Sequence, residues 1–397
     1  MTIYRWMLFF LFLLSACQTT EESKKGGEPS NARPLELASI DFSKEQLLTL
    51  ADQYLGQAPV PITQFFCERS AGGRHDFYSE GDYWWPNPED PDGPYIRKDG
   101  KTNPENFVSH RKAMRNLNEW VSSLVAAYKI TGDEKYANHA LRHLRAFFLD
   151  PATLMNPNLL YAQAIKGRVT GRGIGLIDTI HFIEVAKAIE ELVSLGFLKE
   201  AEENALKAWF EEFLIWMNTH PYGLAEKVHG NNHSTWWAAQ VATFAHLTER
   251  TDYLDTARQQ LPKLLAIQMA KDGSFPEELE RTKPYNYTLF NLEGYAVLCQ
   301  IASSKEFDLW HYEGPNGSLG KAWQFMKPYL VDKSSWIKAP DVQHFDELPI
   351  QSPGMLFAAL AYKDQELFDT WQELSPERKS EEINRTYPIS QFLLWVD

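Results

Sequence analysis

Paired stripes of apolar residues dominate the sequence from residue 107 onward and constrain its fold more than any other feature. Apolar side chains recur every three or four positions, which is the pattern of a helix with one buried face. The first two stripes are Met114, Leu117, Val121, Leu124 and Tyr128, then Ala137, Ala140, Leu141, Leu144 and Phe148. A polar turn with Asp133 as its expected helix N-cap separates them, so this stretch predicts a helical hairpin.

The same pattern returns along the chain and predicts further helical stretches over 180–193, 205–217, 232–270, 289–304, 318–331 and 353–373. Similar turn sequences recur at Asp133, Asp252 and Asp364, which lie 119 and 112 residues apart. No alternating pattern of a β-strand rises above this background. The prediction is an all-α fold, either an open α-solenoid or an (α/α) toroid of helical hairpins. Long irregular loops favour the toroid, because such loops can build a cleft at its mouth.

Residues 1–16 have the layout of an export signal. Arg5 precedes an apolar run over 6–14 that is too short to cross a bilayer as a helix. The sequence LSAC then ends at Cys17 and is similar to the lipobox of bacterial lipoproteins, in which the cysteine is acylated. We therefore expect a lipid anchor at Cys17 in the envelope of a Gram-negative bacterium, on the periplasmic side or at the outer-membrane surface. Cleavage to an ordinary secreted protein is the alternative.

The remaining chain divides into a short polar segment and one large domain. Residues 17–34 are rich in Gly, Pro and Ser and predict a flexible tether, and residues 35–397 predict a single toroid domain. Cys67 and Cys299 are the cysteines of that domain, and their spacing does not establish whether they pair.

Net charge narrows the choice of partner. The chain has 39 basic and 53 acidic residues, a formal charge of −14, and no dense basic stripe. Nucleic acid is therefore excluded as a partner, because the field of the whole protein would repel phosphate. A polyanionic substrate would require a local basic groove.

The first candidate site segment lies in a long loop, residues 56–106, that lacks helical or strand periodicity. Tyr83, Trp84 and Trp85 are adjacent there and offer flat faces to sugar rings. Arg97 and Lys98 follow as cations for an anionic ligand. The alternative for each aromatic residue is that it pins the loop to the core.

A second segment, residues 161–175, combines glycines with Gln163, Arg168 and Arg172. Glycines permit close approach of the backbone to a ligand, and the arginines would bind anions. No strand precedes the glycines, so they are not a dinucleotide-binding motif. The alternative is a tight turn whose arginines pair with surface acids.

The third segment, residues 227–237, places Asn232 and His233 at the predicted start of a helix, since Gly230 breaks any helix before it. A helix start attracts anions through its free N–H groups, and imidazole can move a proton. His229 and His233 could be imagined as zinc ligands, but no third ligand accompanies them, so no metal is predicted. A buried, merely hydrogen-bonded His233 is the alternative.

The fourth segment packs Arg281, Lys283, Tyr285 and Tyr287 into seven residues. Nearby cations favour the ionised form of a tyrosine, which a tyrosine that transfers protons requires. If the segment is extended, Tyr285 and Tyr287 share one face.

Taken in order, these motifs resemble the alginate lyase family of (α/α)-toroid polyuronate lyases. They are GDYWWPNP, PDGPYIRKDG and NPE, then YAQA with GRGIG, then NNH followed by Trp, and ELERTKPYNY. The resemblance covers residues 40–390, and the RTKPYNY version is closer to polysaccharide lyase family 38 than to family 5.

The resemblance implies β-elimination of a 4-linked uronate, most simply in alginate, without metal or cofactor. Asn232, His233 and Arg281 would bind the substrate carboxylate, and Tyr287 would carry the protons. Tyr285 is its close competitor. The other implied substrate-binding residues are Tyr83, Trp84, Trp85, Arg97, Gln163, Arg172, His229, Lys283 and Tyr285. Glucuronan is the alternative substrate, because glucuronate differs from mannuronate at C2 and these residues do not distinguish the two configurations at that carbon.

Two further functions are compatible with the sequence. An (α/α)-barrel glycoside hydrolase would use two carboxylates, with Asp272, Glu277 and Glu278 as candidates. A glycan-binding lipoprotein without activity would use the same aromatic residues.

Overall fold

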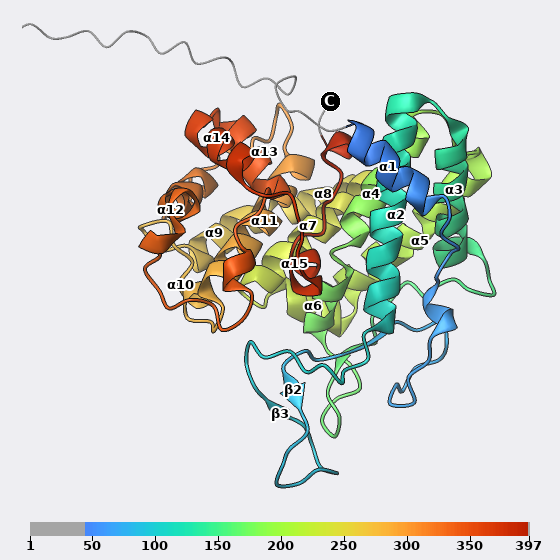
Figure 1. Ribbon diagram of the computed structural model, residues 1–397, viewed down its shortest axis with the longest axis horizontal. Coiled ribbons are helices and arrows are strands. Elements are labelled where there is room, and N and C mark those ends of the chain that lie inside the picture. The colour runs from blue at the N-terminus through green and yellow to red at the C-terminus, as the bar shows by residue number, and fades with distance from the viewer. Residues whose placement is uncertain (1–43, 396–397) are drawn as a thin grey trace, which may run out of the picture. The chain divides into compact units, whose positions relative to one another are not determined.

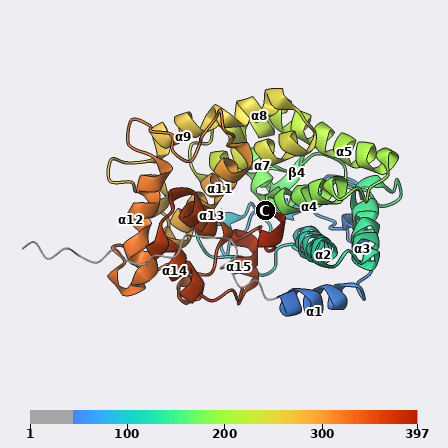
Figure 2. The ribbon, with the colours of Figure 1, turned by 90° about the horizontal axis from the view of Figure 1, so that it is seen from above.

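An inner row of helices organises residues 44–395, the part of the chain that this computed structural model describes (Figures 1 and 2). The inner helices are α2 (Ser109–Thr131), α4 (Phe182–Ser194), α7 (Asn232–Leu247), α11 (Pro284–Ala302) and α13 (Pro353–Tyr362). Each packs against the next in this order. Cys17, the export signal and the tether lie outside the described residues.

A second layer of helices covers this row from outside (Figure 2). The outer helices are α1 (Lys44–Tyr54), α3 (Glu134–Leu144), α5 (Glu200–Thr219), α8 (Thr251–Arg258), α9 (Gln260–Gln268), α12 (Leu319–Val331) and α14 (Gln365–Glu373). α1 and α3 pack on α2, α5 and α8 on α7, and α14 on α13. This double layer is the all-α toroid of helical hairpins that the stripes predict, and Asp133 caps α3 as expected.

Burial differs between the two layers for a physical reason. In α7 every residue except His233 and His246 is buried, whereas Ala257 is the buried residue of α8. α7 is covered on nearly all sides and contains no Asp, Glu, Lys or Arg, whereas an outer helix such as α8 needs only one apolar face. No helix within residues 44–395 is long and apolar enough to cross a membrane.

Short helices and strands form the loops at one end of the inner row. They are α6 (Pro221–Lys227), α10 (Pro276–Leu279), α15 (Glu381–Thr386), β1 (Tyr78–Glu80), β2 (Trp84–Trp85), β3 (Ile96–Arg97) and β4 (Tyr161–Ala164). β1 pairs with β4 in parallel, and β2 pairs with β3 in antiparallel orientation. The sequence did not predict these strands, because segments this short contain too few residues to establish a period of two.

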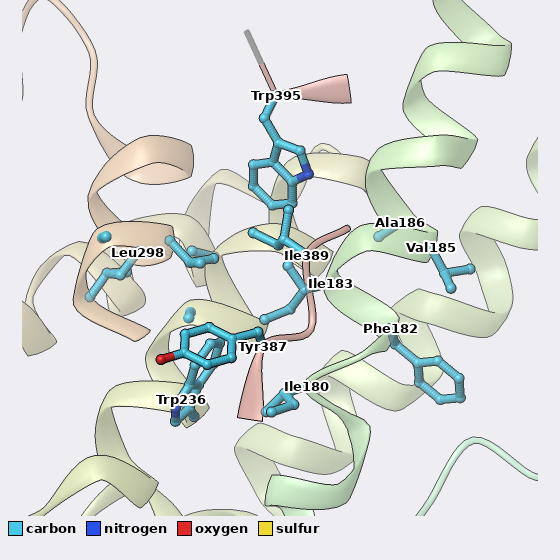
Figure 3. Close-up of a cluster of buried hydrophobic side chains, with 14 of the residues drawn as sticks. Ile180, Phe182, Ile183, Val185, Ala186, Trp236, Leu298, Tyr387, Ile389 and Trp395 are labelled. Carbon is cyan, nitrogen blue, oxygen red and sulfur yellow. The ribbon is translucent and has the colours of Figure 1, made fainter. Parts of the chain in front are cut away.

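Residues 378–395, here called the C-terminal strap, run through the centre of the inner row (Figure 2). Figure 3 shows Tyr387 and Ile389 of the strap among Ile183, Trp236 and Leu298. The strap is also held by polar contacts. The Glu184 carboxylate on α4 accepts hydrogen bonds from the backbone N–H groups of residues 390 and 391 at 2.8 and 2.7 Å.

Cys67 and Cys299 are both buried free thiols, so the described domain contains no disulfide between them. They belong to two separate apolar clusters. Burial raises the pKa of Cys299 well above its usual range. The stability of the domain therefore comes from its core and its buried polar contacts.

Glu293 is a buried carboxylate that joins α11 to α13. Its two oxygens lie 3.0 and 2.9 Å from the backbone nitrogen of Gly354, which donates to them. Burial raises the pKa of Glu293 to about 7, from an ordinary value of 4.5. Folded protein therefore keeps a proton that the unfolded chain releases between these two pH values. Stability from this group is present below pH 4.5 and is lost as the pH rises through 7.

We expect Glu293→Gln to be more stable than wild type at pH 8, by up to about 3 kcal/mol, and similar to it at pH 4.5. Glutamine keeps an acceptor oxygen for Gly354 and cannot ionise. Urea unfolding at both pH values measures the difference. Glu306→Gln, at an exposed site, is the matched control. Equal pH dependence of the Glu293 variant and wild type would contradict the assignment.

Candidate active site

A cleft of about 460 Å³ opens where α7 and α11 begin. Its walls come from residues 82–84 and Arg97, from α2, from β4 and the segment after it, from the start of α7 and of α11, and from the C-terminal strap. Among the lining side chains are Tyr83, Trp84, Arg97, Gln163, Arg172, His229, Asn232, His233, Arg281, Lys283 and Tyr287. Residues from all four candidate segments of the sequence therefore meet at one place.

Asn232 is the first residue of α7 and is held by Glu278 from α10. The backbone nitrogen of Asn232 donates to Oε1 of Glu278 at 2.8 Å, and its Nδ2 donates to both carboxylate oxygens at 2.8 and 2.9 Å. Glu278 is 1% exposed, and burial raises its pKa although these hydrogen bonds oppose the rise. The carboxylate thus fixes both the helix start and the rotamer of the Asn232 amide.

His233 follows on the next position and is oriented by a second buried carboxylate. Its Nδ1 lies 2.6 Å from Oε1 of Glu226, which is 1% exposed and belongs to α6. Asn231 caps the helix by accepting from the backbone N–H of His233 at 3.1 Å. Because Nδ1 is occupied, Nε2 is the ring nitrogen available to a ligand in the cleft.

Arg281 and Tyr287 form another part of the cleft wall. The guanidinium of Arg281 donates to the Tyr287 hydroxyl at 2.9 Å, and its carbon lies 3.9 Å from the ring centroid. Asp99 anchors the same guanidinium at 3.2 Å. Burial raises the pKa of Tyr287 well above its usual range, and the positive charge of Arg281 works against this rise.

Tyr83 meets Tyr287 through its hydroxyl, with 2.8 Å between the two oxygens. The sequence suggested Tyr83 as a flat face for a sugar ring. Its position adds a polar role, because the two phenols, which both line the cleft, share a hydrogen bond.

Neighbouring residues of β2 and β3 separate into cleft and outer faces. Trp84 and Arg97 line the cleft, whereas Trp85 does not. Trp85 points the other way, as alternate residues of a strand do, and its Nε1 donates to the backbone carbonyl of Lys101 at 2.8 Å. Lys98 lies over its ring at 4.8 Å. The prediction of Trp85 as a substrate-binding residue is therefore corrected, and it pins the loop.

Gln163, which belongs to β4, is held by hydrogen bonds from Arg172. Arg172 donates to the backbone carbonyl of Gln163 at 2.9 Å and to its side-chain oxygen at 3.2 Å. Gln163 has φ +58°, a left-handed conformation that costs free energy in a residue other than glycine. Within the described residues Arg172 has no carboxylate partner closer than 4 Å, and burial lowers its pKa to about 10. It is a cation that an anionic ligand would satisfy.

Lys283 and His229 also line the cleft. Lys283 is 1% exposed and its charge is balanced by Glu382 at 2.8 Å. The His229 ring lies 4.8 Å from the His233 ring, and burial lowers its pKa. Among residues 44–395 no three His, Cys, Asp or Glu side chains are grouped to hold a metal ion.

Tyr285 does not reach the cleft. The segment is helical rather than extended, since α11 begins at Pro284, and residues two apart on a helix point in different directions. Tyr285 is fully buried and donates its hydroxyl to the carbonyl of Tyr329 at 3.0 Å. The prediction of Tyr285 in the site is wrong, and Tyr287 is the tyrosine that faces the cleft.

The three candidate carboxylates of a hydrolase do not line the cleft either. Asp272 accepts hydrogen bonds from the backbone and hydroxyl of Ser274 at 3.0 and 2.6 Å. Glu277 is exposed, and Glu278 lies beneath Asn232. The carboxylates that the sequence offered for glycoside hydrolysis are therefore not in place to act on a ligand in the cleft.

Several charged residues of the cleft were missed by the sequence analysis. They are Asp82, Arg111, Arg115, Asp178, Glu382 and Arg385. Arg111 and Arg115 lie one turn apart on α2, and two arginines on a face that also carries Met114 were a usable signal. Arg385 pairs with Asp82 across 303 residues of sequence, and no local pattern announces such a contact.

Fold and site together define a helical-toroid polysaccharide lyase, with an Asn–His pair and an Arg–Tyr pair lining one cleft. A sequence profile of the alginate lyase family matches residues 67–336, and the chain belongs to this family.

Known proteins of this kind resemble the chain to different extents. An alginate lyase from Bacteroides ovatus is 30% identical, covers 89% of this chain and 92% of its own, and superposes with a TM-score of 0.78. An alginate lyase from Pseudomonas syringae pv. tomato is 30% identical over 113 residues, which span 28% of this chain and 29% of that relative. Alginate lyase A1-III, crystallised as a variant with tetrasaccharide, shares the fold at 13% identity, with a TM-score of 0.55 over 89% of this chain and 94% of its own.

We expect Glu278→Ala to lower kcat/KM by about 10²-fold, because Asn232 loses the partner that fixes its position. The variant should also lose about 1–3 kcal/mol of stability, since buried N–H groups are left without an acceptor. Initial rates of unsaturated product and urea unfolding measure the two effects. Glu277→Ala, at the exposed neighbouring residue, is the control. Equal rates in the two variants would contradict the role assigned to Glu278.

Proposed function

We propose that the enzyme cleaves a 4-linked polyuronate, with mannuronate-containing alginate as its substrate, by β-elimination that needs no metal. One observation carries the proposal: the Tyr287 hydroxyl, 2.9 Å from Arg281, faces a cleft that Asn232 and His233 also line. The cleft thus combines a candidate proton carrier with groups suited to a carboxylate.

Carboxylate recognition would fall to Asn232, His233 and Arg281. A uronate carboxylate placed between them would receive hydrogen bonds and positive charge, which reduce its electron-donating effect on C5. The C5–H bond next to a neutralised carboxylate is more acidic, because the carboxylate can accept the electron pair that the proton leaves behind. This lowers the barrier to the first step.

Proton transfer would fall to Tyr287. As phenolate, its oxygen takes H5, the electron pair forms the C4–C5 double bond, and the C4–O4 bond breaks. The same phenol then donates its proton to O4 of the leaving sugar, so that tyrosinate is regenerated. Arg281 favours the phenolate, whereas burial disfavours it.

Stereochemistry supports mannuronate as the substrate. In mannuronate and glucuronate, H5 and O4 lie on the same side of the ring, so one tyrosine reaches both. In guluronate they lie on opposite sides, and His233 would have to act as the base. Glucuronate differs from mannuronate at C2 alone, so glucuronan is the competing substrate and the substrate panel below decides between them.

We expect polymannuronate to yield products that absorb ultraviolet light, at a higher kcat/KM than polyguluronate or glucuronan. Elimination creates a conjugated double bond, whereas hydrolysis does not. The measurement is absorbance together with product size for the three polymers. Reducing ends without absorbance would contradict elimination, and a preference for glucuronan would contradict the assignment of substrate.

Tyr287→Phe serves as the matched variant in this panel. It removes the hydroxyl alone and should abolish cleavage while leaving polymer binding nearly intact. Tyr285→Phe is its control and should retain most activity, because that ring is outside the cleft. Unchanged cleavage by the Tyr287 variant would refute its role as proton carrier.

We also propose that the chain is exported and anchored by an acylated Cys17 in a Gram-negative envelope. The lipobox-like LSAC sequence and the apolar run before it support this. Cells supplied with labelled palmitate should incorporate label into the wild type and not into Cys17→Ser. Label in both proteins, or in neither, would contradict the anchor.

A further inference from the structure

Two loops beside the cleft are joined into one wall. The turn after β4, residues 165–171, lies against the loop that leads into β3. The backbone nitrogen of Tyr95 donates to the carbonyl of Lys166 at 3.1 Å, and Nε of Arg168 donates to the carbonyl of Tyr95 at 2.8 Å. Gly167 between them has φ +74°, and a Cβ there would lie 2.8 Å from Cα of Pro94. The close approach requires glycine.

This wall carries cations without acidic partners. Lys166 and Arg168 are exposed, and neither has a carboxylate within 4 Å among residues 44–395. Lys166 lies 5.7 Å from the Tyr95 ring centroid. The chain has a formal charge of −14 and many acidic residues, yet these two neighbouring cations form no ion pair with any of them in the described part of the chain.

Arg168 connects the wall to the cleft. Its guanidinium lies 5.1 Å from the ring centroid of Trp84, and the guanidinium of Arg172 lies 6.0 Å from the same ring. Trp84 and Arg172 both line the cleft. Positive charge therefore continues from the cleft, across one indole ring, to the exposed turn.

The same turn lines a second hollow of about 640 Å³, outside the cleft. Its charged lining residues are Arg69, Glu80, Lys166 and Arg168. Glu80 is buried and bound by Arg69 at 2.6 and 2.7 Å; burial opposes ionisation, but Arg69 keeps its pKa below the usual range. Lys166 and Arg168 are therefore the free charges of the hollow, and their sign suits a polyanion.

We propose that this hollow is a distal binding site for further uronate residues of the same polysaccharide chain, with Lys166 and Arg168 binding their carboxylates. The inference rests on the proposed function and extends it beyond the cleft. The site makes binding depend on chain length, because only a chain long enough to fill the cleft and the hollow together contacts both. Its contribution falls with salt, since both cations are exposed.

The test compares KM for polymannuronate with KM for a mannuronate tetrasaccharide in wild type and in Lys166→Ala/Arg168→Ala. We expect the ratio of tetrasaccharide KM to polymer KM to fall about threefold to tenfold at low salt. The effect should shrink in about 0.5 M NaCl. Lys199→Ala/Lys305→Ala removes the same charge at exposed positions elsewhere and should leave the ratio unchanged. An unchanged ratio in the Lys166/Arg168 variant overturns the proposal.

Arg168→Lys separates charge from loop structure. It keeps the cation but loses the Nε contact with Tyr95, so it should retain most of the polymer preference. If it is as impaired as Arg168→Ala, the contact between the loops matters rather than the charge, and the proposal is overturned.

Binding measured without turnover keeps this proposal separate from the catalytic one. In the Tyr287→Phe background, calorimetry should show weaker polymannuronate binding when Lys166 and Arg168 are replaced, with tetrasaccharide binding far less affected. If wild type cleaves no polyuronate, the proposed function fails, and this difference in binding would still support the distal site. Equal polymer binding in the two proteins overturns it.

Discussion

Two buried carboxylates at the start of α7 are the contacts on which the site depends. Glu278 holds Asn232 and Glu226 holds His233, and each comes from a different short helix. A buried carboxylate is costly unless hydrogen bonds compensate it, so these pairs tolerate little displacement. The position of the Asn–His pair in the cleft is thereby coupled to the packing of α6 and α10 on the inner row.

The same device recurs away from the cleft. Glu293 accepts a hydrogen bond from the backbone at the start of α13, and Glu184 accepts hydrogen bonds from the backbone of the C-terminal strap. Helices that are buried on all sides have no side that faces solvent. Acidic side chains on them therefore accept hydrogen bonds from the backbone N–H groups of neighbouring segments. This explains why Glu184 and Glu293, which are buried on inner helices, accept hydrogen bonds from backbone N–H groups.

The periodicity of apolar residues predicted most of the fold, but it did not predict which side chains of a short segment face the cleft. The stripes predict the helices, and Gly230 followed by an apolar helix places Asn232 and His233 correctly at a helix start. Residue type alone did not separate Tyr285 from Tyr287, because the segment is helical and turns residues two positions apart to different surroundings. The prediction for Trp85 fails because neighbouring residues of a strand point to opposite faces, and Trp85 points away from the cleft. Arg385 could not be found, since its partner Asp82 is distant in sequence and depends on the completed fold.

The C-terminal strap determines when the site becomes complete. During synthesis the chain folds from its N-terminal side, and the strap leaves the ribosome after every inner helix. Arg385 and Glu382 travel on it, so Asp82 and Lys283 remain without these partners until it is inserted. A polypeptide that ends before the strap would lack α15 and one wall of the cleft, and the carboxylate of Glu184 would lose its backbone partners. Completion of the catalytic cleft is thus tied to translation of the last part of the message.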